Sequence, residues 1–293
     1  MRVERLAIIG CGLMGGSLAL ALRAQCLVTH VAGFSASAGT RALALQLGVI
    51  DEACDSVAQA VRGADVVLLA VPVQATEASL AAMAPHLHAQ ALVMDVGSTK
   101  QDVVAAARRT LGSALPRFVP AHPVAGKEVA GVAHADATLY QDRHLILTPL
   151  PETDPAGLER ARALWTAVGS HVSQLDPQLH DAAMAAVSHL PHLAAFALVN
   201  AVARQPQGAL FLSLAGPGFR DFSRIAASAP SVWRDILLAN RTEVLQQAAL
   251  MRQALTELEA AMQADDGSRL SALIDEASQT RSRWRLGGAP TDC

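Results

Sequence analysis

The stretch Leu6-Ala7-Ile8-Ile9-Gly10-Cys11-Gly12-Leu13-Met14-Gly15 decides the fold. Four apolar residues typical of a buried strand lead into the pattern G-x-G-x-x-G, and an apolar helical segment follows. In this context Gly10 allows a tight turn, Gly12 lets the backbone approach a pyrophosphate, and Gly15 lets the helix pack on the strand. The phosphates then lie on the free N–H groups of the helix N-terminus. A glycine turn without a ligand is the alternative. The cofactor contacts that this motif predicts are Gly10, Gly12, Leu13, Met14 and Gly15.

Short apolar runs alternate with helical patterns through the first half of the chain, which predicts an α/β fold with a doubly wound, mostly parallel sheet of the Rossmann type. A helix over Pro155–Val168 and a strand near His171–Leu175 are expected to complete the sheet. Ligands of such sheets bind outside the carboxyl ends of the strands, where we expect Val71 and Pro72 to contact the cofactor. The candidate strands that precede the helix over Pro155–Val168 are Leu6–Ile9, Val28–Gly33, Val66–Val71, Leu92–Asp95, Arg117–Pro120 and His144–Leu147.

After Asp176-Pro177 the sequence pattern changes from alternating strands and helices to mainly helical periodicity. We therefore expect a dinucleotide-binding domain over residues 1–175, an all-α domain over 176–286 and a flexible tail over 287–293. A segment from about Ser228 to Ala264 contains no glycine and reads as one long helix that starts with Pro230 in its first turn. Its apolar seam indicates either packing inside one domain or a dimer interface. The seam residues are Leu237, Val244, Met251, Leu258, Ala248, Leu255 and Met262.

Composition excludes several classes of function. Apolar residues make up 52% of the 293 residues and the net charge is −3, so neither disorder nor nucleic-acid binding is favoured. No uncharged apolar run reaches the roughly 18 residues of a membrane span. The start of the chain has no signal-peptide layout. The cysteines have no paired short spacing, which favours a reducing cytoplasm over a disulfide framework or a metal site. They are Cys11, Cys26, Cys54 and Cys293.

The end of the second strand bears on the choice of cofactor. NAD enzymes usually carry an acid there to hold the ribose 2′-hydroxyl, but the stretch from Ala32 to Arg41 contains neither Asp nor Glu. The expected acid position falls on Ser35. Hydroxyls at Ser35 and Ser37, with Arg41 nearby, suit a 2′-phosphate and favour NADP. If Arg41 is a solvated helix residue, the site takes either cofactor.

Two polar clusters follow predicted strands. Asp95-Val96-Gly97-Ser98-Thr99-Lys100 places Ser98 where it can bind a substrate or orient a neighbour, although Ser98 or Thr99 could instead only cap the next helix. The stretch from His122 to Glu128, HPVAGKE, contains a histidine before a proline, which restricts its backbone. The pKa of histidine suits proton acceptance at physiological pH, although a lone histidine is more often structural.

A third set lies in the helical half, as Ser188-His189-Leu190-Pro191-His192 and then Gly218–Arg224, GFRDFSR. If a helix covers Asp221–Ala227, Arg220 and Arg224 lie near each other at its first turn. Fixed guanidinium groups suit a dianionic substrate. The alternative is a surface ion pair between Asp221 and Arg224.

Together, and in this order, these motifs resemble the prephenate/arogenate (cyclohexadienyl) dehydrogenase family, the TyrA enzymes. The resemblance spans roughly residues 5 to 240. The motifs HPVAGKE, SHLPH and GFRDFSR are far more specific to this family than the glycine turn, which many dinucleotide-binding proteins share. It implies an NAD(P)-dependent enzyme of tyrosine biosynthesis that oxidatively decarboxylates a cyclohexadienyl acid, arogenate, prephenate or both. The ring becomes aromatic as hydride leaves, which supplies the driving force.

The resemblance also implies roles. His122 accepts the proton of the ring hydroxyl, so activity should fall as His122 becomes protonated. Ser98 binds the same hydroxyl or orients His122. Arg224 binds a substrate carboxylate, and His189 lines the pocket. Glu128 and Asp221 match positions near its mouth. A homodimer through the helical domain is expected, with a small molecule as substrate.

Two other readings remain open. A β-hydroxyacid dehydrogenase of the 6-phosphogluconate type, or an imine reductase, shares this architecture. The lysine-dependent version is disfavoured because Lys127 is the last lysine in the sequence. A non-catalytic dinucleotide sensor would keep the glycine turn but would not need His122, Ser98 and Arg224.

Overall fold

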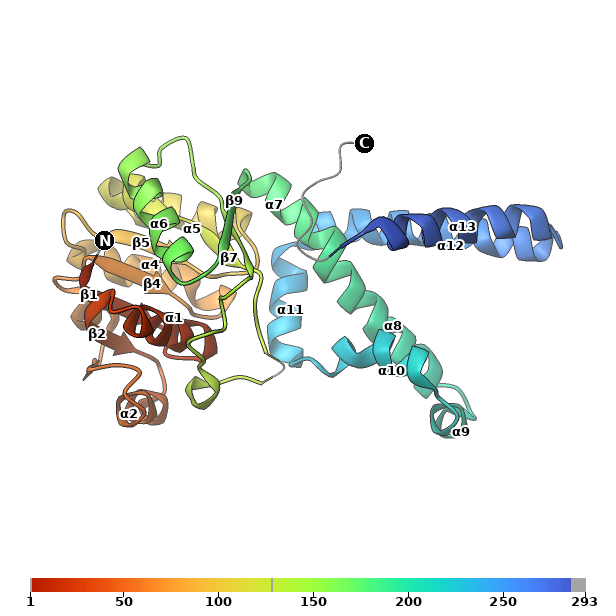
Figure 1. The fold of residues 1–293 in the computed structure, drawn as a ribbon, viewed down its shortest axis with the longest axis horizontal. Coiled ribbons are helices and arrows are strands. Elements are labelled where there is room, and N and C mark those ends of the chain that lie inside the picture. The colour runs from red at the N-terminus through yellow and green to blue at the C-terminus, as the bar shows by residue number, and fades with distance from the viewer. Residues whose placement is uncertain (1, 128, 286–293) are drawn as a thin grey trace. The chain divides into compact units, whose positions relative to one another are not determined.

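A computed structural model describes residues 2–127 and 129–285. Its N-terminal part is built on a six-stranded parallel sheet in the order β3-β2-β1-β4-β5-β6 (Figure 1). This order and the crossover helices confirm the predicted doubly wound fold. The strands are β1 (Val3–Ile9), β2 (Val28–Phe34), β3 (Glu52–Ala53), β4 (Val66–Leu69), β5 (Leu92–Asp95) and β6 (Phe118–Val119).

Helices cover both faces of this sheet because side chains alternate along each strand. On β1, Leu6 and Ile8 belong to one buried cluster with residues of α1 and α6, whereas Ala7 and Ile9 belong to a second with residues of α3, α4 and α5. Burying one such aliphatic side chain contributes about 1.5–3 kcal/mol. The helices are α1 (Leu13–Ala24), α2 (Ala38–Gln46), α3 (Val57–Val61), α4 (Thr76–Met83), α5 (Gln101–Thr110) and α6 (Pro155–Ala167).

A second, three-stranded sheet corrects one expectation. The strands predicted at 144–147 and 171–175 do not extend the main sheet, but form β8 (His144–Leu147) and β9 (His171–Gln174) beside β7 (Ala121–Pro123). β7 and β8 are antiparallel, and β8 and β9 are parallel. Pro120 separates β6 from β7, and a proline has no N–H to continue a ladder. The chain beyond it therefore pairs with β8.

The helical half begins with one continuous helix made of α7 (Pro177–Met184), a π-helical turn (Ala185–His189) and α8 (Leu190–Ala203). By length and composition alone, this helix of 27 residues, with mean hydropathy 1.6 over an 18-residue window, is long and apolar enough to cross a membrane. A core helix of a soluble protein meets the same criterion. This helix also contains Asp181, which is buried and hydrogen-bonded.

Two helix boundaries differ from the prediction. The helix expected over Asp221–Ala227 starts earlier, as α10 (Pro217–Ser223), because Pro217 occupies its first turn, and a 3₁₀ turn over Arg224–Ala227 follows. The long helix expected to 264 is broken at Asn240 (φ −100°, ψ 29°), between α11 (Pro230–Ala239) and α12 (Arg241–Gln263). The remaining short elements are α9 (Gly208–Ser213) and 3₁₀ turns at Val73–Ala75, Ala84–His86, Gly112–Arg117 and Val132–His134.

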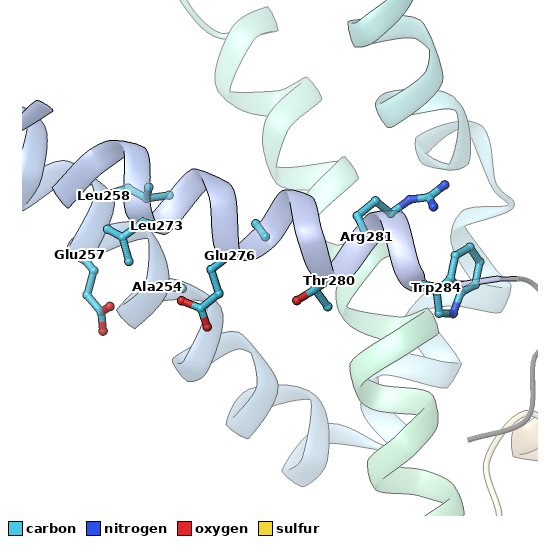
Figure 2. A pocket seen from close by; sticks show the side chains of 9 residues that line it. Ala254, Glu257, Leu258, Leu273, Glu276, Thr280, Arg281 and Trp284 are labelled. Atoms are coloured by element: carbon cyan, nitrogen blue, oxygen red, sulfur yellow. The ribbon is translucent and has the colours of Figure 1, made fainter. Parts of the chain in front are cut away.

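The chain divides into two compact units, Met1–Asn240 and Arg241–Cys293. In the second unit α12 packs along α13 (Gly267–Arg283), and a hollow of about 770 Å³ lies between them (Figure 2). Of the predicted seam, Val244 and Ala248 are buried, whereas Met251, Leu255 and Met262 are exposed. The predicted domain boundary after residue 175 remains a prediction. The predicted tail, 287–293, lies outside the described residues.

Candidate active site

The turn between β1 and α1 needs its glycines for steric reasons. Gly10 has φ 106°, and a Cβ there would collide with the carbonyl oxygen of Ala70. A Cβ at Gly15 would lie 2.7 Å from Ile8 Cγ2, so only glycine lets the helix pack this closely on the strand. At Gly12, by contrast, nothing lies within 4 Å of the Cβ position. Gly12 therefore faces open space at the start of the helix.

This open space fits a dinucleotide pyrophosphate. The first turn of α1 carries no acidic residue, and its N-cap residue Gly12 has no capping side chain, so backbone N–H groups are available to an anion. Leu13 and Met14 are half-buried there. β4 pairs with β1 in parallel, with Leu69 opposite Ile9. Val71 and Pro72, two and three residues further on, thus follow the strand next to the turn.

The turn between β2 and α2 is already hydrogen-bonded. The Ser37 hydroxyl caps α2 by accepting from the Thr40 N–H at 3.2 Å. The Arg41 guanidinium donates to the Ser35 carbonyl oxygen at 2.7 Å and pairs with Asp55 at 3.1 Å. The Asp55 side chain is 88% exposed, so water screens this pair. Arg41 is thus held at the turn by groups that a bound phosphate can replace.

A buried ion pair joins β5 to β7. Asp95, the last residue of β5, pairs with Lys100, which is fully buried. Both side chains also bind the backbone of Ala121: Asp95 Oδ1 accepts from its N–H at 3.0 Å, and Lys100 Nζ donates to its carbonyl at 2.9 Å. This pair sets the position of the next residue, His122.

The N-terminus of α5 is capped from the helical half. The Asp181 carboxylate on α7 accepts from the backbone N–H groups of Lys100 at 2.8 Å and Gln101 at 2.9 Å. Neither Ser98 nor Thr99 provides this cap. The half-buried Ser98 hydroxyl makes no hydrogen bond within the described part of the chain, which leaves it for another role.

His122 stands at the end of a row of buried polar side chains. Its Nδ1 lies 2.8 Å from His180 Nε2, and His180 Nδ1 lies 2.8 Å from Asp181 Oδ1. His122 is 8% exposed, and none of the described residues hydrogen-bonds its Nε2. Burial, followed by the charges of His180, Lys100 and His189, holds the pKa of His122 well below its usual range. His122 is therefore neutral near pH 7.

His189 is held by Asn240. The Asn240 amide donates to the Asp181 carbonyl oxygen at 2.7 Å and lies 3.1 Å from His189 Nδ1. Because that amide nitrogen is a donor, Nδ1 is an acceptor and neutral His189 carries its proton on Nε2. Burial lowers the pKa of His189 to about 4, with His180 and His192 adding to the effect and Asp181 opposing it.

An aromatic stack extends from His189 to His192. The His189 ring lies 6.1 Å from the Trp233 ring, which in turn stacks on His192 at 3.4 Å. Burial and the nearby charge of Arg224 lower the pKa of His192, against the Ser188 carbonyl, which raises it. Arg224 itself is exposed.

The remaining predicted substrate-binding residues are Asp221 and Glu128. Asp221 is exposed and pairs with Arg220 at 2.9 Å, rather than with Arg224 as the alternative interpretation had it. Glu128 lies outside the described residues. Among those that are described, no group of three or more His, Cys, Asp or Glu side chains is arranged to hold a metal.

Sequence reasoning missed His180, Asp181 and Asn240. A charged residue within the most apolar helical stretch was the available signal for Asp181, since such a charge needs partners. Nothing in the sequence indicated that the partners of Asp181 lie at the start of α5, about 80 residues earlier, or that His180 contacts His122 of β7, 58 residues earlier.

Two family models match nearly the whole chain. The prephenate dehydrogenase nucleotide-binding domain matches residues 18–174, and the prephenate dehydrogenase dimerization domain matches residues 176–276. The chain belongs to the prephenate dehydrogenase family. It is therefore an NAD(P)-linked dehydrogenase of tyrosine biosynthesis whose reaction is an oxidative decarboxylation, and its cofactor is a nicotinamide dinucleotide.

Individual members of the prephenate dehydrogenase family align over most of the chain. A cyclohexadienyl dehydrogenase of Zymomonas mobilis is 35% identical, over 95% of both chains. The crystal structure of prephenate dehydrogenase from Aquifex aeolicus, in complex with hydroxyphenyl propionate and NAD+, has a TM-score of 0.90 at 33% identity and covers 96% of this chain and 98% of that one. Synechocystis arogenate dehydrogenase has a TM-score of 0.83 at 29% identity, over 96% and 100%.

Proposed function

We propose that the substrate is prephenate, arogenate or both, and that His122 is the proton acceptor. The observation that carries this proposal is the state of the His122 ring. It is neutral and almost buried, one nitrogen is bound by His180, and the other has no partner within the described residues. A ring in this state can accept a proton from a substrate hydroxyl.

The chemistry follows from the substrate. The ring carbon that bears the hydroxyl loses a hydride, the hydroxyl proton passes to His122 Nε2, and CO₂ leaves as the ring becomes aromatic. The nicotinamide supplies a hydride acceptor when bound. The protein provides position and a base, since aromatisation provides the driving force.

Other side chains hold the substrate in this proposal. Ser98 binds the same hydroxyl or orients His122. This role is supported because the Ser98 hydroxyl makes no hydrogen bond to the described residues. Arg224 binds a substrate carboxylate, supported by its exposure and its proximity to the His192–Trp233 stack. His189 presents an Nε2–H to the pocket. Asp221 also belongs to the proposed substrate site, and Glu128, outside the described residues, is assigned to that site by its place in the family's motif.

We propose that the cofactor is preferentially NADP+. Gly10, Gly12, Leu13, Met14 and Gly15 hold the pyrophosphate, with Val71 and Pro72 beside them. Ser35, Ser37 and Arg41 take the 2′-phosphate. Two observations support this: no acid occurs from Ala32 to Arg41, and the ion pair that holds Arg41 at the turn is with the exposed carboxylate of Asp55.

The proposed assembly is a homodimer through the α-helical residues 176–286, with 1–175 as the cofactor domain. The match of the dimerization model to residues 176–276 supports it. We place the enzyme in the cytoplasm. The described cysteines, Cys11, Cys26 and Cys54, are free thiols, as a reducing compartment would keep them.

A steady-state assay tests the function, with prephenate or arogenate each paired with NAD+ or NADP+. We expect turnover with at least one acid and a higher kcat/KM with NADP+. Because the pKa of His122 is lowered, its neutral form persists below pH 6.5, so the acid limb of kcat/KM should lie below that value. His122→Asn should lower kcat by about 100-fold or more while the KM for cofactor stays within about twofold.

His171→Asn is the control, since His171 is an exposed residue of β9. Its kinetics should match those of the wild type. Failure of both acids, with cofactor binding intact, would contradict the proposal and favour a hydroxyacid or imine substrate. Near-normal turnover by His122→Asn would remove His122 from the mechanism.

A further inference from the structure

Three buried side chains form one directed row, Asp181–His180–His122, in which both contacts measure 2.8 Å. His180 and Asp181 are 0% and 2% exposed, and His122 is the only one of the three with a ring nitrogen left over. The direction of the hydrogen bonds along this row sets where the His122 proton resides.

Asp181 determines the direction at one end. Burial alone would raise the pKa of Asp181, but the hydrogen bonds from His180, Gln101 and Lys100 outweigh it and lower that pKa. An ionised carboxylate only accepts, so His180 Nδ1 must donate to it. With its proton on Nδ1, His180 has a bare Nε2, which accepts from His122 Nδ1. His122 Nε2 is consequently left without a hydrogen and faces outward as a proton acceptor.

The surrounding charges favour this arrangement over its alternative. A protonated His180 would donate to His122 and turn the outward nitrogen into an N–H donor. The groups around the row are the Lys100 cation with its partner Asp95, the Asp102 carboxyl near Lys100 and Asp181, and neutral His189. The arrangement in which His180 accepts from His122 adds no second cation beside buried Lys100, where such a cation is unfavourable at low dielectric.

We propose that His180 and Asp181 are positioning residues that hold His122 in the Nδ1–H tautomer, which makes its Nε2 the base for the substrate hydroxyl. This inference rests on the proposed function of His122 and extends it. When the hydroxyl proton reaches Nε2, His122 becomes an imidazolium whose Nδ1–H still donates to His180. The Asp181 carboxylate stabilises that charge through His180 without taking up a proton.

The anchoring of Asp181 supports this role. Its carboxylate accepts from His180 and from two backbone N–H groups of α5, and its carbonyl accepts from Asn240. Four hydrogen bonds leave Asp181 little freedom to turn, so the row keeps one direction.

The test compares His180→Phe with His180→Gln in the full-length enzyme loaded with cofactor. Phe keeps a ring but offers no acceptor, whereas Gln places an amide oxygen near the former Nε2. We expect His180→Phe to lower kcat on the order of 10- to 100-fold with the KM for cofactor unchanged. His180→Gln should recover most of that loss. His171→Phe is the matched surface control and should behave as wild type.

Nitrogen-15 NMR of the histidine rings gives a readout that does not depend on turnover. The His122 signals, assigned by their loss in His122→Asn, should show the Nδ1–H tautomer in the wild type and lose that preference in His180→Phe. A wild-type His122 with its proton on Nε2 would overturn the proposal, even if His180→Phe failed to fold. So would an unchanged kcat and tautomer in folded His180→Phe. If no acid is turned over but the tautomer is as expected, the proposed function fails while the row's effect on His122 stands.

Discussion

At the scale of single residues, burial decides the chemistry of the histidines. His189 is 1% exposed and accepts a hydrogen bond from Asn240, so protonation would both bury a charge and break that bond. Its pKa is accordingly lowered to about 4. The unfolded chain has no such environment, and its histidines titrate near 6.5.

This difference predicts a loss of stability in mild acid. Between pH 6.5 and 4 the unfolded state binds a proton at His189 that the folded state does not, so stability falls as the pH falls. From pH 7 to 5 the contribution of His189 is about 2 kcal/mol. Urea unfolding at both pH values, on wild type and His189→Asn, measures it.

The His189→Asn variant is expected to be less stable at pH 7 but to lose about 2 kcal/mol less than the wild type on acidification. Equal losses in the two proteins would show that His189 titrates normally in the fold.

At the scale of elements, the turn from β2 to α2 combines a cap with a cation. Ser37 caps α2, and Arg41, on the first turns of that helix, ties the turn together through the Ser35 carbonyl. Asp55 competes for the same guanidinium. The affinity of this turn for a 2′-phosphate therefore depends on how Arg41 divides between Asp55 and the ligand.

Two matched variants separate these contributions. Arg41→Ala should lower kcat/KM for NADP+ by about tenfold or more, because a charge-assisted hydrogen bond is worth about 1.5–3 kcal/mol. Asp55→Asn should raise it, because Arg41 loses its competitor. Neither should change kcat/KM for NAD+ more than about threefold. Equal effects on both cofactors would place Arg41 outside the 2′-phosphate site.

At the scale of the whole molecule, the C-terminal helices leave an apolar surface in the single chain. Leu255 and Met262, both part of the predicted seam, are 50% and 58% exposed on α12. Exposed apolar residues that recur along one helix are typical of an interface. In a family with a dimerization domain, a second copy of this chain is the partner we expect.

The double variant Leu255→Glu/Met262→Glu tests this surface, since it would bury unpaired charges in a dimer. We expect light scattering at micromolar concentration to give twice the chain mass for the wild type and the single-chain mass for the variant. Leu45→Glu, at a half-exposed leucine of α2, is the control and should stay dimeric. A monomeric wild type, or a double variant that remains dimeric, would contradict the prediction.

Local sequence patterns were sufficient for the central fold. The alternation of apolar strands and helices predicted the parallel sheet, and the turn from Gly10 to Gly15 forms as expected. The demand on Gly15 comes from Ile8 within the same turn, whereas the demand on Gly10 comes from Ala70, which the parallel pairing of β4 with β1 brings close. The family, too, follows from short motifs such as HPVAGKE and SHLPH.

Tertiary structure alone decided what depends on distant partners. The break at Asn240 lies in a run with good helical periodicity, and it arises because the Asn240 side chain reaches Asp181 and His189. His180 likewise has no motif of its own, and its role comes from a neighbour 58 residues away. The spacing of apolar residues along the sequence indicates only which local backbone conformation is preferred. The partners of a buried polar group are determined only when the chain closes around it.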